Sequence, residues 1–241
     1  MTEKIAKLQD IIDNSHKVVF FGGAGVSTES GIPDFRSQDG LYNQKYKYPP
    51  ETILSHDFFM DNTEEFYDFY RDKMLALDAQ PNAAHKWLAQ LEAAGKLTAV
   101  VTQNIDGLHQ RAGSRRVYEL HGTVHTNRCM RCGKFYTAED ILNSTGIAKC
   151  ECGGTIKPKV VLYDEDLNMD IYNRSINAVI DADTLIVAGT SLTVYPAAGI
   201  VRYFDGANLV LINRDATPLD SQADLVIHGS VGQVLSQIKI R

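Results

Sequence analysis

The chain has 241 residues, of which 44% are hydrophobic and 22% are charged, as in an ordinary globular protein that needs no cross-links to hold its core. Its formal net charge of −6 disfavours a general nucleic-acid binder, which would present a basic face. The sequence has no uninterrupted run of about 18 apolar residues, so we predict no membrane span. Residues 1–8 predict an amphipathic helix without the apolar core of a signal peptide, so we expect a cytoplasmic protein.

A strand predicted over residues 17–21 runs straight into a glycine-rich loop at 22–25 (GGAG). Glycines let the backbone approach a pyrophosphate closely, and free N–H groups at the start of a following helix favour its negative charge. The loop departs from the G-x-G-x-x-G fingerprint, and the segment 33–36 (PDFR) is too polar for the interior of a crossover helix. We therefore expect a ligand that carries phosphate, bound by an unusual loop.

Further along the chain, strands and helices are predicted to alternate. Residues 37–60 are rich in polar residues, glycine and proline, and predict a loop with short turns. The spacing of apolar residues predicts helices over 63–77 and 81–95. Continuous apolar runs predict further strands over 97–102, 183–189, 208–213 and 223–227. This pattern indicates an α/β fold: an open parallel sheet with helices on both faces, interrupted by a helical insertion and a cysteine-bearing insertion.

Polar residues follow several of the predicted strands. In parallel sheets, ligands bind beyond the carboxyl ends of the strands, so these residues are expected to share one crevice. The polar strand ends are residues 22–27, 102–106, 189–191 and Asn213.

The four cysteines form two closely spaced pairs, Cys129 with Cys132 and Cys150 with Cys152. Zinc binds four thiolates in a tetrahedron, and each short pair can place two ligands round one ion. The second pair is Cys-x-Cys, which is shorter than the usual Cys-x-x-Cys. The alternative is four free or redox-active thiols. We expect one structural zinc ion, because four cysteine ligands leave no open position for catalysis.

Two amides and a carboxylate, Gln103, Asn104 and Asp106, follow the strand predicted over 97–102. Side chains of these types could hold a carboxamide or ribose hydroxyls. The alternative is the start of a helix that Asn104 or Asp106 caps.

A histidine, His121, is expected on a short strand before Gly122. Histidine titrates near neutrality and is therefore a natural general base. Position alone does not select His121 over His109 or His125.

Several motifs, in order along nearly the whole chain, together resemble the bacterial-type sirtuins, which are NAD-dependent protein-lysine deacetylases. These motifs are 23–27 with 34–36, 102–106, His121-Gly122, the four cysteines and 189–192. The resemblance implies a Rossmann-like sheet domain and a small domain built from the two insertions. The sheet domain would comprise residues 1–36, 82–124 and 158–241. The helical insertion with a cofactor loop would comprise residues 37–81, and the zinc-ribbon module residues 125–157.

The resemblance also implies that NAD lies along the glycine-rich loop and the strand ends. Ala24, Gly25 and Thr28 would follow its pyrophosphate and ribose, while Phe35 and Arg36 would belong to a mobile cofactor loop. The phosphate and adenosine end would be held by Gly189, Thr190, Ser191, Asn213 and Val231.

The nicotinamide end of NAD is implied to lie against residues 103–106. Gln103 and Asn104 would hold ribose hydroxyls, and Asn104 would also be catalytic. Ile105 and Asp106 would bind the carboxamide in an inner pocket that includes Ser27. His121 would be the general base.

The reaction implied by the resemblance consumes NAD. The acyl oxygen of an acetylated lysine on a partner protein would attack ribose C1′ and expel nicotinamide. The 2′-hydroxyl would then attack the alkylimidate while His121 removes a proton, and water would release lysine and O-acetyl-ADP-ribose. The alternative is an NAD-dependent mono-ADP-ribosyltransferase, which shares the first step. A zinc-knuckle binding module without turnover, or a zinc dehydrogenase, fits the proposed base and the closed cysteine site less well.

The segment expected to pair with a substrate peptide departs from the family pattern Val-x-Phe-Gly-Glu, because residues 161–165 read Val-Leu-Tyr-Asp-Glu. A peptide would add to this segment by backbone hydrogen bonds and lie against Val194 and Tyr195. Asp164 adds a negative charge beside the peptide, which predicts a preference for basic residues flanking the target lysine. The expected peptide contacts are Val161, Tyr163, Asp164, Val194 and Tyr195.

The acyl group is expected to be neutral, acetyl above all. Relatives that remove succinyl groups carry Tyr-x-x-Arg on the helical insertion, where the arginine pairs with the extra carboxylate. Here the arginine, Arg71, falls one residue late after Tyr67.

Overall fold

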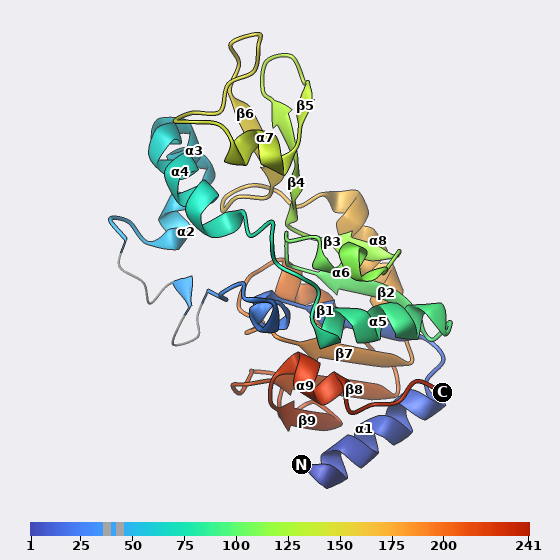
Figure 1. Ribbon diagram of the computed structural model, residues 1–241. Coiled ribbons are helices and arrows are strands. Elements are labelled where there is room, and N and C mark those ends of the chain that lie inside the picture. Colours follow the sequence, from blue (N-terminus) through green and yellow to red (C-terminus); the bar gives the residue numbers. More distant parts are fainter. Residues whose placement is uncertain (36–39, 42–45) are drawn as a thin grey trace.

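The computed structural model describes residues 1–35, 40–41 and 46–241. Its largest element is a parallel sheet in the order β3-β2-β1-β7-β8-β9 (Figure 1). This order reverses direction between β1 and β7, which is the point where open α/β sheets bind their ligands. The open parallel sheet expected from the sequence is confirmed. Its strands are β1 (Val18–Gly22), β2 (Leu97–Thr102), β3 (Val117–Glu119), β7 (Thr184–Ala188), β8 (Asn208–Asn213) and β9 (Leu225–His228).

Helices cover both faces of this sheet because its strands are apolar on both sides. In β1, Val18 and Phe20 join one buried cluster while Val19 and Phe21 join another. The first cluster is covered by α1 (Thr2–Asn14), α5 (Ala83–Ala93) and α9 (Val231–Leu235). The second is covered by α8 (Met169–Ile180) and a 3-10 helix, Ala197–Tyr203. A short helix, α6 (Leu108–Ala112), follows β2.

A smaller antiparallel sheet lies above the parallel sheet in Figure 1, next to a group of short helices. Its order is β5-β4-β6. The small sheet and the helices share a third buried cluster, which is rich in aromatic rings such as Phe59, Phe66 and Tyr70. The elements are β4 (Gly122–Cys129), β5 (Phe135–Tyr136), β6 (Ile156–Val160), α2 (Pro50–Ile53), α3 (His56–Asp61), α4 (Thr63–Phe69) and α7 (Ala138–Leu142).

Three local expectations need correction. Residues 37–60 are not only loop, because α2 and α3 form there; Ser55 caps α3 by accepting a hydrogen bond from the Phe58 amide at 3.2 Å. The helix expected over 63–77 ends its α-helical part at Phe69 and continues as a π-helical turn over Tyr70–Met74. His121 lies in the turn between β3 and β4 rather than on a strand.

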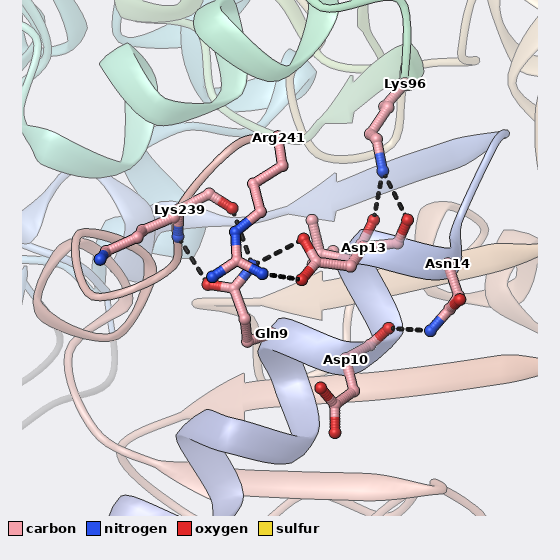
Figure 2. A network of polar contacts seen from close by, with 8 residues as sticks. Gln9, Asp10, Asp13, Asn14, Lys96, Lys239 and Arg241 are labelled. Carbon is pink, nitrogen blue, oxygen red and sulfur yellow. Dashed lines mark hydrogen bonds and ion pairs between the residues drawn. The ribbon is translucent and has the colours of Figure 1, made fainter.

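The end of α1 is tied to the C-terminal segment by side-chain contacts (Figure 2). The Gln9 side chain bonds both the amide and the carbonyl of Lys239, and Arg241 pairs with Asp13 at 3.0 Å. Lys96 donates to the last carbonyls of the same helix. Among the described residues, no helix has the length and apolarity needed to cross a membrane.

Candidate active site

A cavity of about 400 Å³ lies at the carboxyl ends of the parallel strands and extends toward the small sheet. All of the NAD and peptide residues expected from the sequence line its wall, apart from Arg36, which lies outside the described residues. The cavity therefore gathers side chains from segments that are far apart in the chain. The expected residues on its wall are Ala24, Gly25, Thr28, Phe35, Gln103, Asn104, Ile105, Asp106, His121, Val161, Tyr163, Asp164, Gly189, Thr190, Ser191, Val194, Tyr195, Asn213 and Val231.

The glycine-rich loop after β1 lies directly against the loop after β7. The Gly25 amide donates to the Gly189 carbonyl at 2.8 Å. A Cβ atom on Gly25 would lie 2.8 Å from the Gly189 Cα, and Gly189 itself has φ +59°, which favours glycine. The close approach of two backbones explains why both positions are glycine. Both residues line the cavity, so the paired backbones form part of its floor at the switch point of the sheet.

The buried side chains of Ser27 and Asn104 form a polar network with the partly buried Asp106 on the cavity wall. The Ser27 hydroxyl donates to Asp106 Oδ2 at 2.6 Å and accepts from Asn104 Nδ2 at 3.0 Å. The other carboxylate oxygen, Asp106 Oδ1, accepts from the Leu108 amide at 2.9 Å. The N-cap position of α6 is Gly107, so the alternative interpretation of Asp106 as the cap holds only in that its carboxylate accepts from the first amide of the helix. Asp106 still lines the cavity.

The three histidines that position alone could not rank are separated by their surroundings. His121 lines the cavity, and its Nδ1 lies 3.0 Å from the Gln103 carbonyl oxygen. His109 is buried against the ring of His85 and does not line the cavity. His125 lies on β4, outside the cavity wall, with Nε2 2.9 Å from the Asp106 carbonyl oxygen.

The protonation state of His121 follows from these contacts. A carbonyl oxygen can only accept, so Nδ1 carries the proton and the neutral ring keeps its lone pair on Nε2. Burial lowers the pKa of His121, and the bond to Gln103 opposes that effect without cancelling it. The imidazole is therefore neutral at pH 7 and able to accept a proton.

A chain of amide and hydroxyl groups leads along the cavity wall from Gln103 to Asn213. Gln103 Nε2 donates to Thr190 Oγ1 at 3.0 Å, and the Thr190 amide donates to Asn213 Oδ1 at 2.9 Å. The buried Nδ2 of Asn213 has no hydrogen-bond partner among the described residues. A buried donor without a partner is costly, so this end of the cavity fits a ligand with polar oxygens, such as a ribose or a phosphate.

The four cysteine thiols converge on one point of the small sheet. Their Sγ atoms all lie within 4.8 Å of one another, with Cys129 and Cys152 at 3.5 Å and Cys132 and Cys150 at 3.6 Å. These separations are too long for disulfides and match the edge of a zinc–thiolate tetrahedron, about 3.8 Å for Zn–S bonds of about 2.3 Å. The residues fit one structural zinc ion, as expected from their spacing.

Residues of the cavity wall that the sequence did not indicate include several from the helical insertion and from the loop after β8. They line the cavity only because the chain folds back over it, and apolar residues among them carry no local signal of function. They include Leu54, Lys73, Met74, Leu162, Arg214 and Asp215. The contact between His125 and Asp106 was also missed, because it depends on how β4 crosses the loop after β2.

Comparisons with a family model, with curated proteins and with solved structures agree with one another. A family model described as Sir2 family matches residues 23–196. The NAD-dependent protein deacetylases of Clostridium acetobutylicum and Clostridium perfringens are 58% and 56% identical to the chain, and each alignment covers 99% of both sequences. A solved Sir2 variant with a deacetylated p53 peptide and 3′-O-acetyl ADP ribose has a TM-score of 0.89 at 41% identity, over 97% of this chain and 96% of that one. A complex of Sir2 with p53 peptide and NAD+ has a TM-score of 0.85 at 41% identity, over 96% of this chain and 95% of that one.

Proposed function

This chain belongs to the Sir2 family, and on that premise we propose how its cavity carries out NAD-dependent protein deacetylation. The chain is an NAD-dependent protein deacetylase, whose relatives include structures with a deacetylated peptide and an acetyl-ADP-ribose. NAD supplies the electrophilic ribose carbon and is consumed. The chain's own residues then have three tasks: to hold NAD, to hold the acetylated lysine, and to move one proton.

The single observation that carries the proposal is the setting of His121. Its Nδ1–H is fixed by the Gln103 carbonyl, so Nε2 is left as the proton acceptor in the cavity. Because burial keeps the ring neutral, His121 acts as the general base that removes a proton from a ribose hydroxyl. Asn104, held by Ser27, orients the ribose beside it.

The inner network holds the nicotinamide end of NAD. Asp106 keeps its carboxylate oriented through Ser27 and the Leu108 amide, and together with Ile105 it accepts the carboxamide. Gln103 lies between the two ends and contacts a ribose. The phosphates are assigned to the cavity floor that the packed backbones of Gly25 and Gly189 form.

The adenosine end of NAD is assigned to the polar chain beyond the glycine floor. The free Nδ2 of Asn213 donates to a ribose or phosphate oxygen. Thr190, Ser191 and Val231 complete this end, and Ala24, Thr28 and Phe35 lie along the cofactor between its two ends. The role of Arg36 in the cofactor loop stays a prediction, because this residue lies outside the described residues.

The acetylated peptide is assigned to the opposite rim of the cavity, between Val161 with Tyr163 and Val194 with Tyr195. The adjacent acidic residues differ in availability. Glu165 is bound internally to His56, Lys157 and the Leu162 amide, whereas Asp164 is exposed. Asp164 therefore presents its charge to the peptide and favours basic residues beside the target lysine.

The charge on Asp164 can be tested with one substitution. Asp164 has φ +69°, a conformation that asparagine tolerates, so Asp164→Asn removes the charge without adding strain. The ratio of kcat/KM for peptides with basic and acidic flanks should fall by about 2- to 5-fold in the variant, consistent with a partly screened surface charge. An unchanged ratio at low salt would contradict the assignment.

The helical insertion supports a neutral acyl group. Arg71 donates to the Gly146 carbonyl at 2.8 Å and contacts Ser144 and Asp68, and it lies outside the cavity wall. Tyr67 is buried with its hydroxyl bonded to the Ile156 carbonyl. Because both side chains are engaged elsewhere, neither is placed to pair with a carboxylate on the acyl group. Acetyl-lysine should be turned over with higher kcat/KM than succinyl-lysine.

The division into a sheet domain and two insertions follows the three buried clusters. The helical insertion (37–81) and the zinc module (125–157) share a cluster to which Val124, Val160 and Leu162 of the adjoining sheet segments also contribute. The other two clusters are formed by the sheet segments 1–36, 82–124 and 158–241 alone. Acetylated proteins are its substrates. A thiolate zinc site suits a reducing compartment, so we place the enzyme in the cytoplasm.

The reaction is tested by incubating the zinc-loaded protein with NAD and an acetylated peptide. Mass spectrometry should find nicotinamide, the free-lysine peptide and O-acetyl-ADP-ribose. His121→Ala should lower kcat/KM by about 10²- to 10⁴-fold, the usual contribution of a general base. Unimpaired turnover in this variant would disprove the role of His121, and a peptide or protein carrying ADP-ribose would instead indicate ADP-ribosyl transfer.

A further inference from the structure

The loop that carries Asp106 is fastened to β4 at two neighbouring points. The Val124 amide donates to the Ile105 carbonyl at 3.0 Å, which is a backbone bond that any residue could make. The second fastening is a side-chain bond, because His125 Nε2 lies 2.9 Å from the Asp106 carbonyl oxygen. Since a carbonyl only accepts, His125 is the donor and its Nε2 carries the proton.

The backbone of the loop is shaped to receive this ring. Gly107 has φ +70°, and a Cβ atom at this position would lie 2.6 Å from His125 Nε2. The residue after Asp106 therefore lacks a side chain where the imidazole rests. The His125 imidazole packs into the space that the missing side chain of Gly107 leaves. This close fit indicates a specific contact, although His125 is exposed.

The loop's remaining contacts show what the bond controls. The side-chain carboxylate of Asp106 accepts hydrogen bonds from Ser27 and from the first amide of α6. Its backbone carbonyl accepts a hydrogen bond from His125. With both its side chain and its carbonyl fixed, the residue has little freedom to rotate, so the carboxylate is preorganised toward the cavity.

We propose that His125 is a positioning residue for nicotinamide binding, which acts by hydrogen-bonding the Asp106 carbonyl and so fixing the Asp106 carboxylate for the NAD carboxamide. The proposal rests on the assignment of Asp106 to nicotinamide under the proposed function. His125 lies outside the cavity wall and acts only through the loop. Its loss should therefore weaken the binding of NAD and nicotinamide, and should not affect the binding of acetylated peptide.

The test compares the zinc-loaded wild type with His125→Ala, His125→Gln and His16→Ala. A glutamine amide can still donate to the Asp106 carbonyl, so His125→Gln is the conservative variant. His16 is an exposed histidine that precedes β1, at the end of the sheet opposite the cavity, and serves as the matched control. The affinities for NAD, nicotinamide and acetylated peptide are measured by calorimetry, one ligand at a time, together with the midpoint of thermal unfolding.

His125→Ala should weaken NAD and nicotinamide binding by about 3- to 10-fold, which corresponds to one hydrogen bond. Peptide affinity should stay within about 2-fold, and His125→Gln should restore NAD affinity to within about 2-fold of the wild type. His16→Ala should match the wild type. If His125→Ala leaves NAD affinity unchanged, weakens peptide binding equally, or is not rescued by glutamine, His125 has no positioning role.

Binding is measured without turnover, so the two proposals fail separately. Asp106→Asn should weaken NAD binding if the nicotinamide assignment holds. If Asp106→Asn has no effect, the assignment under the proposed function is wrong, and the inference on His125 is wrong with it. If Asp106→Asn weakens NAD binding while His125→Ala does not, only the inference on His125 is overturned.

Discussion

The parallel sheet and the small β5-β4-β6 sheet are held together by different means. Every residue of β1 and β7 is buried, and apolar clusters cover both faces of their sheet. In β4 buried and exposed residues are mixed, β5 has two residues, and the four thiols stand beside the shared aromatic cluster. Apolar burial is enough to order the first region. The small sheet contributes few buried residues of its own to the cluster that it shares with the short helices, so we expect its order to depend on metal ligation.

Removing the metal should have the largest effect and should separate the two regions. Ligation of structural zinc contributes about 10–16 kcal/mol in zinc-finger peptides, far more than a small sheet gains from packing. Treatment with a strong chelator should raise amide hydrogen exchange over residues 125–157 and abolish deacetylation, while residues 184–213 stay protected. Adding zinc back should reverse both changes. Equal loss of protection in both regions would show that they unfold as one unit.

A pair of core substitutions sharpens the same contrast. Phe66 and Phe21 are both fully buried, one in the aromatic cluster and one in the parallel sheet. Phe66→Ala and Phe21→Ala should each lower the free energy of unfolding by about 3–5 kcal/mol, because each leaves a cavity. Only Phe66→Ala should also weaken zinc binding, measured by competition with a chromophoric chelator. Equal zinc affinities in both variants would contradict the separation.

Acid should destabilise the sheet region through two buried histidines. Burial lowers the pKa of His85 to about 4, and it lowers the pKa of His109 well below its usual value. As the pH falls through about 6.5, these histidines become protonated in the unfolded chain but stay neutral in the folded chain. The free energy of unfolding is therefore unaffected at pH 7 and declines below that pH. For His85 this decline continues to about pH 4.

The contribution of His109 is isolated with His109→Phe, a ring that cannot be protonated. Urea unfolding at pH 7 and pH 5 should show a smaller loss of stability in this variant than in the wild type. The cysteine site is the same in both proteins, and the rings of His85 and His109 are in contact, so the difference between variant and wild type reports the buried histidine pair. An identical loss in both proteins would contradict the prediction.

The smallest effect is expected where α1 meets the C-terminal segment. The ion pair of Arg241 with Asp13 is largely exposed on the arginine side, and exposed pairs contribute about 0–1 kcal/mol (Figure 2). Arg241→Gln should change the thermal unfolding midpoint by no more than about 3 °C. A larger drop would mean that this edge of the sheet region depends on polar contacts more than its buried cluster suggests.

Much of the sheet could be predicted from the sequence because its strands are continuous apolar runs with clear ends. The strands predicted over 97–102 and 208–213 coincide with β2 and β8. The short helices α2 and α3 were missed, because helices of this length gain their stability from burying Ile53, Phe58 and Phe59 in a distant cluster. Sequence patterns do not report such tertiary contacts.

The candidate site divides in the same way. Its glycines, amides and thiols could be found because each chemistry demands a particular residue type at a particular spacing. The roles of single histidines could not be found, since His109 and His125 differ from His121 only in what surrounds them in the fold. His121 was selected as the general base by the family resemblance. The structure gives the physical reason, because of these three histidines only His121 lines the cavity.

The contact between Gly25 and Gly189 also constrains the order of folding. The two residues are separated by about two thirds of the chain, yet their backbones touch and form the floor of the cavity. Contacts between such distant segments form late, because closing a long loop costs entropy before any contact compensates for it. The nascent amino-terminal half therefore emerges from the ribosome without a dinucleotide site. NAD affinity consequently reports completion of the sheet, and a refolding experiment that follows NAD binding would detect the final docking of β7 against β1.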